Sequence, residues 1–165
     1  MNKKLIVGLS SLVLLSGFAA SPIGADKNVG LSVEVGSVAL DSTKLDVTIA
    51  FLVTPGAIET QVFMAAKGIF NFAEVLEVKE TINVATMLEQ VSEKAAQGQP
   101  EVQNVGKVTV KSENGKVVMD FKSEGFRASQ VKLDSENAAT LGRLLRRAKE
   151  VSAWVAPRIA GLKER

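Results

Sequence analysis

The chain has 165 residues, with 20 basic residues against 18 acidic ones and with neither histidine nor cysteine. The absence of both residue types excludes disulfides, removes the usual ligands of zinc, copper and haem, and removes the histidine on which most acid–base catalysis depends. We therefore expect a protein that is not an enzyme and holds no cofactor. A calcium or magnesium site made of carboxylates stays possible, but the chain has no D-x-D-x-D-G loop, so no metal site is predicted.

The N-terminal segment has the residue order of a secretory signal peptide. Two lysines precede an apolar run at residues 5–20, and small residues follow it up to Ala25. The run is shorter than the roughly 20 apolar residues of a membrane-spanning helix, which favours cleavage over a retained anchor. We therefore expect a bacterial protein whose residues 1–25 are removed, leaving a single α+β domain at 26–165 in the periplasm or outside the cell, with no integral membrane span.

Charge is distributed unevenly along the chain that remains. Removal of the two N-terminal lysines brings the net charge to zero, with 18 basic and 18 acidic residues. Residues 26–100 carry 5 basic and 10 acidic side chains, whereas residues 101–165 carry 13 basic and 8 acidic ones. The two halves can neutralise each other within one molecule, join copies head to tail, or draw an acidic partner to the second half.

The first half of the chain predicts two strands and then helices. Residues 29–40 alternate between apolar and polar, as in a half-buried strand, and residues 45–53 are apolar on both faces, as in a central strand. Residues 57–72 carry apolar side chains at helical spacing and predict a helix. Residues 73–82 fit either a strand or a continuation of that helix, and a further helix is predicted over 83–95.

The second half predicts β-structure followed by a long helix. Residues 107–121 form two β-rich runs joined at Asn114-Gly115, which is a strong hairpin signal, and residues 126–133 alternate as a strand. A helix follows, with Asp134 or Ser135 as its N-cap.

Together these elements predict an α+β fold, with an antiparallel sheet of about five or six strands, two to three helices packed on it, and the C-terminal helix as the longest.

Residues 78–97 are weakly similar to residues 131–150 at an offset of 53, which convergent patterning explains as well as a duplication does. Ser129 and Lys132 match a catalytic S-x-x-K pattern. Because residues three apart in a strand point to opposite faces, we do not expect these two side chains to meet.

The segments GKVVMDF and FRASQVKLDSENAATLGRLLRRAKE, strands followed by a capped helix, resemble the β-β-β-β-α unit of PC4-like and Whirly-type single-stranded-DNA-binding proteins. The resemblance covers about residues 106–150 and rests on patterning. It implies nucleic-acid binding but identifies no binding residue in this chain. The secretion signal argues against the intracellular role that such families have.

The last helix carries the candidate binding residues. At about 100° per residue, its leucines, its valines and Ala148 form one apolar stripe that we expect to face the core. The opposite side carries most of the arginines of the helix and the only tryptophan of the chain. The candidate binding residues are Arg143, Arg146, Arg147, Trp154 and Arg158.

Two interpretations of Trp154 remain open from the sequence. Pro157 kinks or ends the helix, and the bend can fold Trp154 against the sheet or under the C-terminal segment. The alternative is an exposed indole beside guanidinium groups, with Arg158 stacked on its ring. Such a surface suits a protein interface, a lipid headgroup region or nucleic-acid bases.

We expect a non-catalytic exported domain that binds a protein partner or self-associates through the basic C-terminal helix, with an anionic envelope surface as a further candidate partner. The alternative from another class is a periplasmic carrier of an apolar or lipid-like ligand. A carrier requires an internal cavity, here lined by the predicted helix at 57–72. Nucleic-acid binding by a PC4-like or Whirly-like unit is the third alternative.

Overall fold

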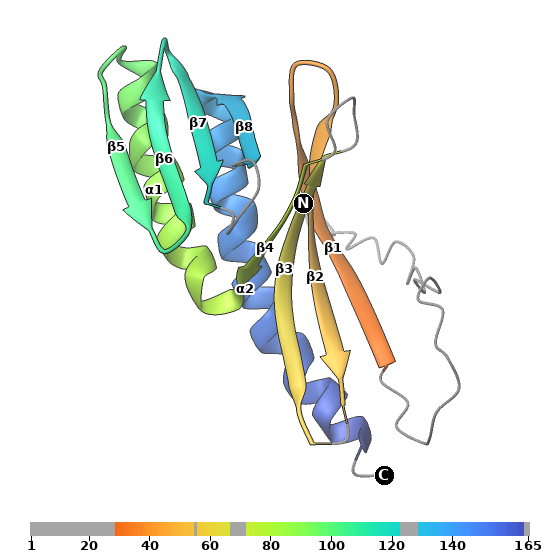
Figure 1. Cartoon of the computed structure of the whole chain (residues 1–165). Helices are drawn as coiled ribbons and strands as arrows, with labels where there is room; N and C mark the ends of the chain where they lie inside the picture. Colours follow the sequence, from red (N-terminus) through yellow and green to blue (C-terminus); the bar gives the residue numbers. More distant parts are fainter. Residues whose placement is uncertain (1–28, 55, 67–71, 123–128, 164–165) are drawn as a thin grey trace, which may run out of the picture.

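The computed structural model describes residues 29–54, 56–66, 72–122 and 129–163, and they form two consecutive units of the same type (Figure 1). Each unit has four strands, paired antiparallel in chain order, and then a helix. The first unit comprises β1 (Val29–Ala39), β2 (Lys44–Val53), β3 (Ile58–Ala66), β4 (Phe72–Glu77) and α1 (Val78–Ala96). The second comprises β5 (Val102–Val105), β6 (Val108–Glu113), β7 (Lys116–Phe121), β8 (Ser129–Asp134) and α2 (Ser135–Lys163). The signal peptide expected at 1–25 lies outside the described residues.

The α+β class is as predicted, and α2, with 29 residues against 19 in α1, is the longer of the two helices in the described part. The prediction of one sheet with five or six strands is wrong, because the described strands form two four-stranded sheets. One missed strand, β5, has only four residues, which is too short to show a clear alternation.

The other missed strand is β3, and the helix predicted over 57–72 is therefore wrong. Val62 and its alternate neighbours point into the core and pair with β2 along the whole length of β3. Phe63, on the opposite face, is also apolar, so the period of two is masked in the sequence. The apolar residues here have helical spacing, but pairing with β2 makes this segment a strand. Residues 67–71 of the predicted helix lie outside the described residues.

Local signals place other boundaries correctly. β4 ends at Glu77 and α1 begins at Val78, so both interpretations of 73–82 hold in part. Asn114 and Gly115 have positive φ angles of 52° and 75° and join β6 to β7, as the hairpin signal predicts.

The long helix α2 begins where the sequence predicts and continues past its proline. Asp134 is the cap, because its Oδ1 accepts a hydrogen bond of 2.7 Å from the Asn137 N–H. Pro157 lies inside α2, which continues to Lys163, so Pro157 does not end the helix.

The two units exchange their helices. α1 packs mainly on β5, β6 and β7, whereas α2 packs mainly on β1, β2 and β3. In Figure 1 both helices lie behind the sheets and against each other, with the chain running in opposite directions along them. The buried side chains of both units form one continuous hydrophobic cluster. Neither sheet is covered until the helix of the other unit has docked.

The helices occupy equivalent positions in the two units, at an offset of 57 residues (Val78 to Ser135). Most positions that are buried in α1 are buried in α2 at this offset, as with Leu88 and Leu145. The weak similarity in the sequence, at an offset of 53, is therefore displaced by about one helical turn. The structural repeat is real, but that alignment of it is wrong.

Gly142 of α2 allows the helices to approach closely. A Cβ atom at this position would lie 3.1 Å from the backbone oxygen of Ala85 and 3.2 Å from Cγ of Glu89. Ala85 is also the residue of α1 that corresponds to Gly142 at the offset of 57. This tight contact between the helices therefore joins equivalent positions of the two units.

Replacing Gly142 with leucine tests this close approach. We expect Gly142→Leu to lower the free energy of unfolding by about 1–3 kcal/mol, because the side chain has to displace the backbone of α1. The matched control is Gly161→Leu, since a Cβ at Gly161 meets no atom within 4 Å. That control should raise stability by about 0.5 kcal/mol through helix propensity. Urea denaturation of both variants measures the difference, and equal effects would contradict the close approach.

Candidate functional site

The apolar stripe predicted on the last helix faces the core. Leu141, Leu145 and Ala148 are fully buried, and Val151 and Val155 are partly buried against the same cluster. The opposite side of α2 is in solvent. Five exposed side chains follow one another on it at intervals of three or four residues, and we call them the α2 outer stripe: Arg143, Arg147, Glu150, Trp154 and Arg158.

Trp154 is exposed and does not fold under a bent C-terminal segment. Its side chain has 61 % relative exposure, and Arg158 places its guanidinium 3.7 Å from the ring centroid. Arg158 also donates a hydrogen bond of 2.6 Å from Nη1 to the Trp154 carbonyl oxygen. This hydrogen bond holds the guanidinium in its position over the ring. The cation and the indole therefore form one preformed surface.

Arg143 and Arg147 extend this surface toward the start of the helix. Arg143 donates a hydrogen bond of 2.8 Å to Oγ1 of Thr140. Within the described part of the chain, none of the ion pairs engages Arg143, Arg147 or Arg158. Glu150 is the acidic member of the α2 outer stripe, and Glu89 of α1 lies near enough to Arg143 for the arginine to contribute to the lowered pKa of Glu89.

Arg146 has a different position from the other four candidate residues. Its guanidinium donates two hydrogen bonds to Glu89, of 2.8 and 2.6 Å, and one of 3.0 Å to Oγ1 of Thr86. These bonds lower the pKa of Glu89 below its ordinary value and raise that of Arg146. Because Glu89 and Arg146 lie at the helix crossing, we assign Arg146 to the contact between the units.

The charge imbalance between the halves is partly neutralised inside the molecule. Among the described residues, three ion pairs join the first half to the second: Lys116 with Asp41 at 3.1 Å, Lys107 with Glu74 at 3.6 Å, and Arg146 with Glu89 at 2.6 Å. Glu74 also accepts a hydrogen bond from Ser129 of β8. The two halves therefore neutralise each other at their contacts, whereas the α2 outer stripe keeps its charge.

A second surface lies on the outer face of the first sheet, the face that α2 does not cover. Leu52 and Phe63, with 41 % and 36 % relative exposure, are the large apolar side chains that stand out on it. Val75 pairs with Phe63 on the same face and is partly buried. The sequence concealed this surface because its central strand, β3, imitates a helix. No alternation marks this face in the sequence, because Phe63 and Ala65 on it are as apolar as the buried Val62 and Met64 on the other face.

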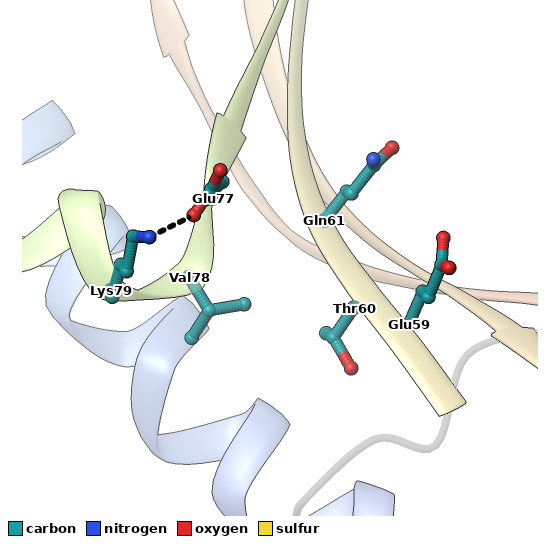
Figure 2. Close-up of a pocket in the computed structure, with 6 residues that line it drawn as sticks. All are labelled: Glu59, Thr60, Gln61, Glu77, Val78 and Lys79. Atoms are coloured by element: carbon teal, nitrogen blue, oxygen red, sulfur yellow. Dashed lines mark ion pairs between the residues drawn. The ribbon is translucent and has the colours of Figure 1, made fainter. Parts of the chain in front are cut away.

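Beside this face lies an open groove between β3 and the start of α1 (Figure 2). The last pair between β3 and β4 joins Gln61 to Glu77, so the first residues of β3 extend beyond the end of β4. Lys79 lies 2.7 Å from the Glu77 carboxylate (Figure 2). The groove is lined by Glu59, Thr60, Gln61, Glu77, Val78 and Lys79. Val78 is the one apolar residue in this lining, and the groove is open to solvent, unlike the enclosed apolar cavity that a lipid carrier requires.

Ser129 and Lys132 lie on opposite faces of β8, as the sequence predicts. Ser129 is opposite Phe121, whose ring is buried, whereas Lys132 is opposite Val118 and its side chain is exposed. The S-x-x-K pattern therefore does not bring the hydroxyl and the amine together.

Comparison with known proteins identifies no relative. No protein-family model matches this sequence, and neither a curated protein nor a solved structure gives a match. Among the described residues no helix is both long and apolar enough to cross a membrane. The geometry of the chain itself is thus the basis for any functional proposal.

The Arg146–Glu89 contact predicts a specific pH dependence of stability. The pKa of Glu89 is lowered in the folded protein, so its contribution is complete above the ordinary value of 4.5 and is lost as the pH falls through the lower folded value. We expect Glu89→Gln to make the free energy of unfolding fall less steeply below about pH 4.5 than it does in the wild type.

Urea denaturation at a series of pH values measures these slopes. The matched control is Glu150→Gln on α2, since Glu150 is exposed and forms no ion pair within the described residues. This control should keep the wild-type slope. A wild-type slope in Glu89→Gln would show that the contact contributes nothing to acid unfolding.

Proposed function

We propose that this protein is a non-catalytic, exported binding domain that docks an acidic protein partner through the α2 outer stripe. The observation that carries the proposal is the exposed Trp154 with the Arg158 guanidinium stacked on its ring. Tryptophan and arginine are the side chains that most often dominate the energy of a protein interface. Burial of an exposed aromatic ring against a partner removes apolar surface from water and so favours binding.

The preformed stack favours binding for a second reason. Arg158 is already held by the carbonyl oxygen of Trp154, so docking needs to immobilise fewer rotatable bonds. Arg143 and Arg147 on the same side add positive charge, which accelerates the encounter with an acidic surface. The α2 outer stripe thus has an apolar anchor, Trp154, and positively charged neighbours on one helix.

Nucleic-acid binding is the second candidate, and one observation favours it. The described chain contains two β-β-β-β-α units, so the resemblance to PC4-like and Whirly-type proteins extends from residues 106–150 to both halves. The carrier hypothesis is less well supported, because Ile58–Ala66 form β3 and not part of the helix that was expected to line a cavity.

Titration of the single tryptophan tests the proposal. Poly-glutamate, single-stranded DNA and anionic vesicles serve as probes, each at low and at physiological salt. We expect poly-glutamate to change the Trp154 emission at physiological salt, and DNA and vesicles to act only at low salt. Strong quenching by single-stranded DNA at physiological salt would instead support nucleic-acid binding.

Two charge reversals provide the matched comparison. Arg147→Glu lies on the α2 outer stripe, and Lys132→Glu lies on the outer face of the second sheet. We expect Arg147→Glu to weaken poly-glutamate binding about tenfold, which corresponds to about 1.4 kcal/mol, and Lys132→Glu to change it less than about twofold. Equal losses would show that binding responds to total charge, and the α2 outer stripe would not be the site.

A further inference from the structure

We propose that the acidic partner is a second copy of this chain, which receives the α2 outer stripe on the outer face of its first sheet. This inference rests on the proposed function, because it uses the same stripe and names its partner. It joins two of the surfaces that are exposed in the described part of the chain. The copies would associate head to tail.

The receiving surface has an apolar centre. Phe63 lies in the middle of the outer face, between Thr48 on β2 and Val75 on β4. Two small side chains, Ala50 and Ala65, point to the same side, as does the longer Gln61. A flat surface of this kind, with exposed Phe63 and small neighbours, accommodates the indole of Trp154 without steric conflict.

The margin of this surface has an excess of negative charge, whereas the α2 outer stripe has an excess of positive charge. Its carboxylates outnumber its ammonium groups, since Lys44 and Lys79 accompany a larger set of acidic residues: Glu34, Asp46, Glu59 and Glu77. The α2 outer stripe has the opposite balance, with three arginines and one glutamate. The first sheet is thus complementary to the stripe in sign and in arrangement, with an apolar centre and a charged margin on each.

The positions of the two surfaces determine the kind of assembly. α2 packs on the inner face of the first sheet, so its outer stripe and the outer face of that sheet lie on opposite sides of the same two layers. Two copies cannot use both surfaces on each other at once. The contact is therefore heterologous, and repetition of it produces open chains instead of a closed dimer.

Analytical ultracentrifugation of the purified secreted protein tests the assembly. We expect the mean mass to rise with concentration beyond that of a dimer, and to fall as salt is added. A protein that stays monomeric up to about millimolar concentration, or whose mass stops at that of a dimer, would overturn the inference.

Two variants each disable one surface. Phe63→Arg places a positive charge at the centre of the receiving face, and the double variant Trp154→Ala/Arg158→Ala removes the anchor of the stripe. We expect each variant alone to be monomeric. Their equimolar mixture should form a dimer that does not grow, because one intact stripe and one intact sheet face remain. Monomers in the mixture would overturn the inference.

The matched control is Val102→Arg, which makes the same type of change at an exposed valine on the second sheet. It should assemble as the wild type does, and loss of assembly here would count against the proposed contact. Circular dichroism verifies folding, and Leu52→Arg on the same face replaces Phe63→Arg if that variant does not fold.

The outcome also separates this inference from the proposed function. If the wild type is monomeric and still binds poly-glutamate in a manner that depends on Arg147, the stripe remains a docking site. The inference about a second copy then fails alone. If the wild type neither assembles nor binds poly-glutamate, both fail.

Discussion

The exchange of helices between the two units is the constraint on which the rest of the structure depends. A four-stranded sheet with one apolar face is not stable until that face is covered. In this chain the cover comes from the other unit, since α1 lies on the second sheet and α2 on the first. The helices must cross to reach these positions, and the crossing requires a residue without a side chain at Gly142. The burial of both sheets thus depends on one close contact.

The same contact determines which arginines are available for binding. Arg146 corresponds to Glu89 in the repeat, and the two side chains meet because equivalent positions meet at the crossing. The other arginines of the helix lie on the far side and point to solvent. The helix wheel separates core from surface correctly, but it cannot distinguish an arginine in a helix–helix contact from one that is free to bind.

Elements whose signals are local could be predicted from the sequence. The Asn114-Gly115 turn and the Asp134 cap depend on a few adjacent residues, and both are where the sequence predicts them. β3 could not be predicted, because the apolar Phe63 on its outer face removes the alternation and only pairing with β2 reveals it. For the candidate site, the sequence identified the residues of the α2 outer stripe. It could not settle the exposure of Trp154, which depends on how α2 continues past Pro157.

The exchange of helices also has a consequence for the order of folding. The first sheet is the first part of the described chain to be synthesised, and its cover, α2, is the last. Its apolar face therefore has no intramolecular partner until nearly the whole chain has been made. Contacts between such distant segments form slowly, because a long loop has to close before they gain any energy. We therefore expect this protein to fold after synthesis as one cooperative event, with no folded first unit that precedes the second.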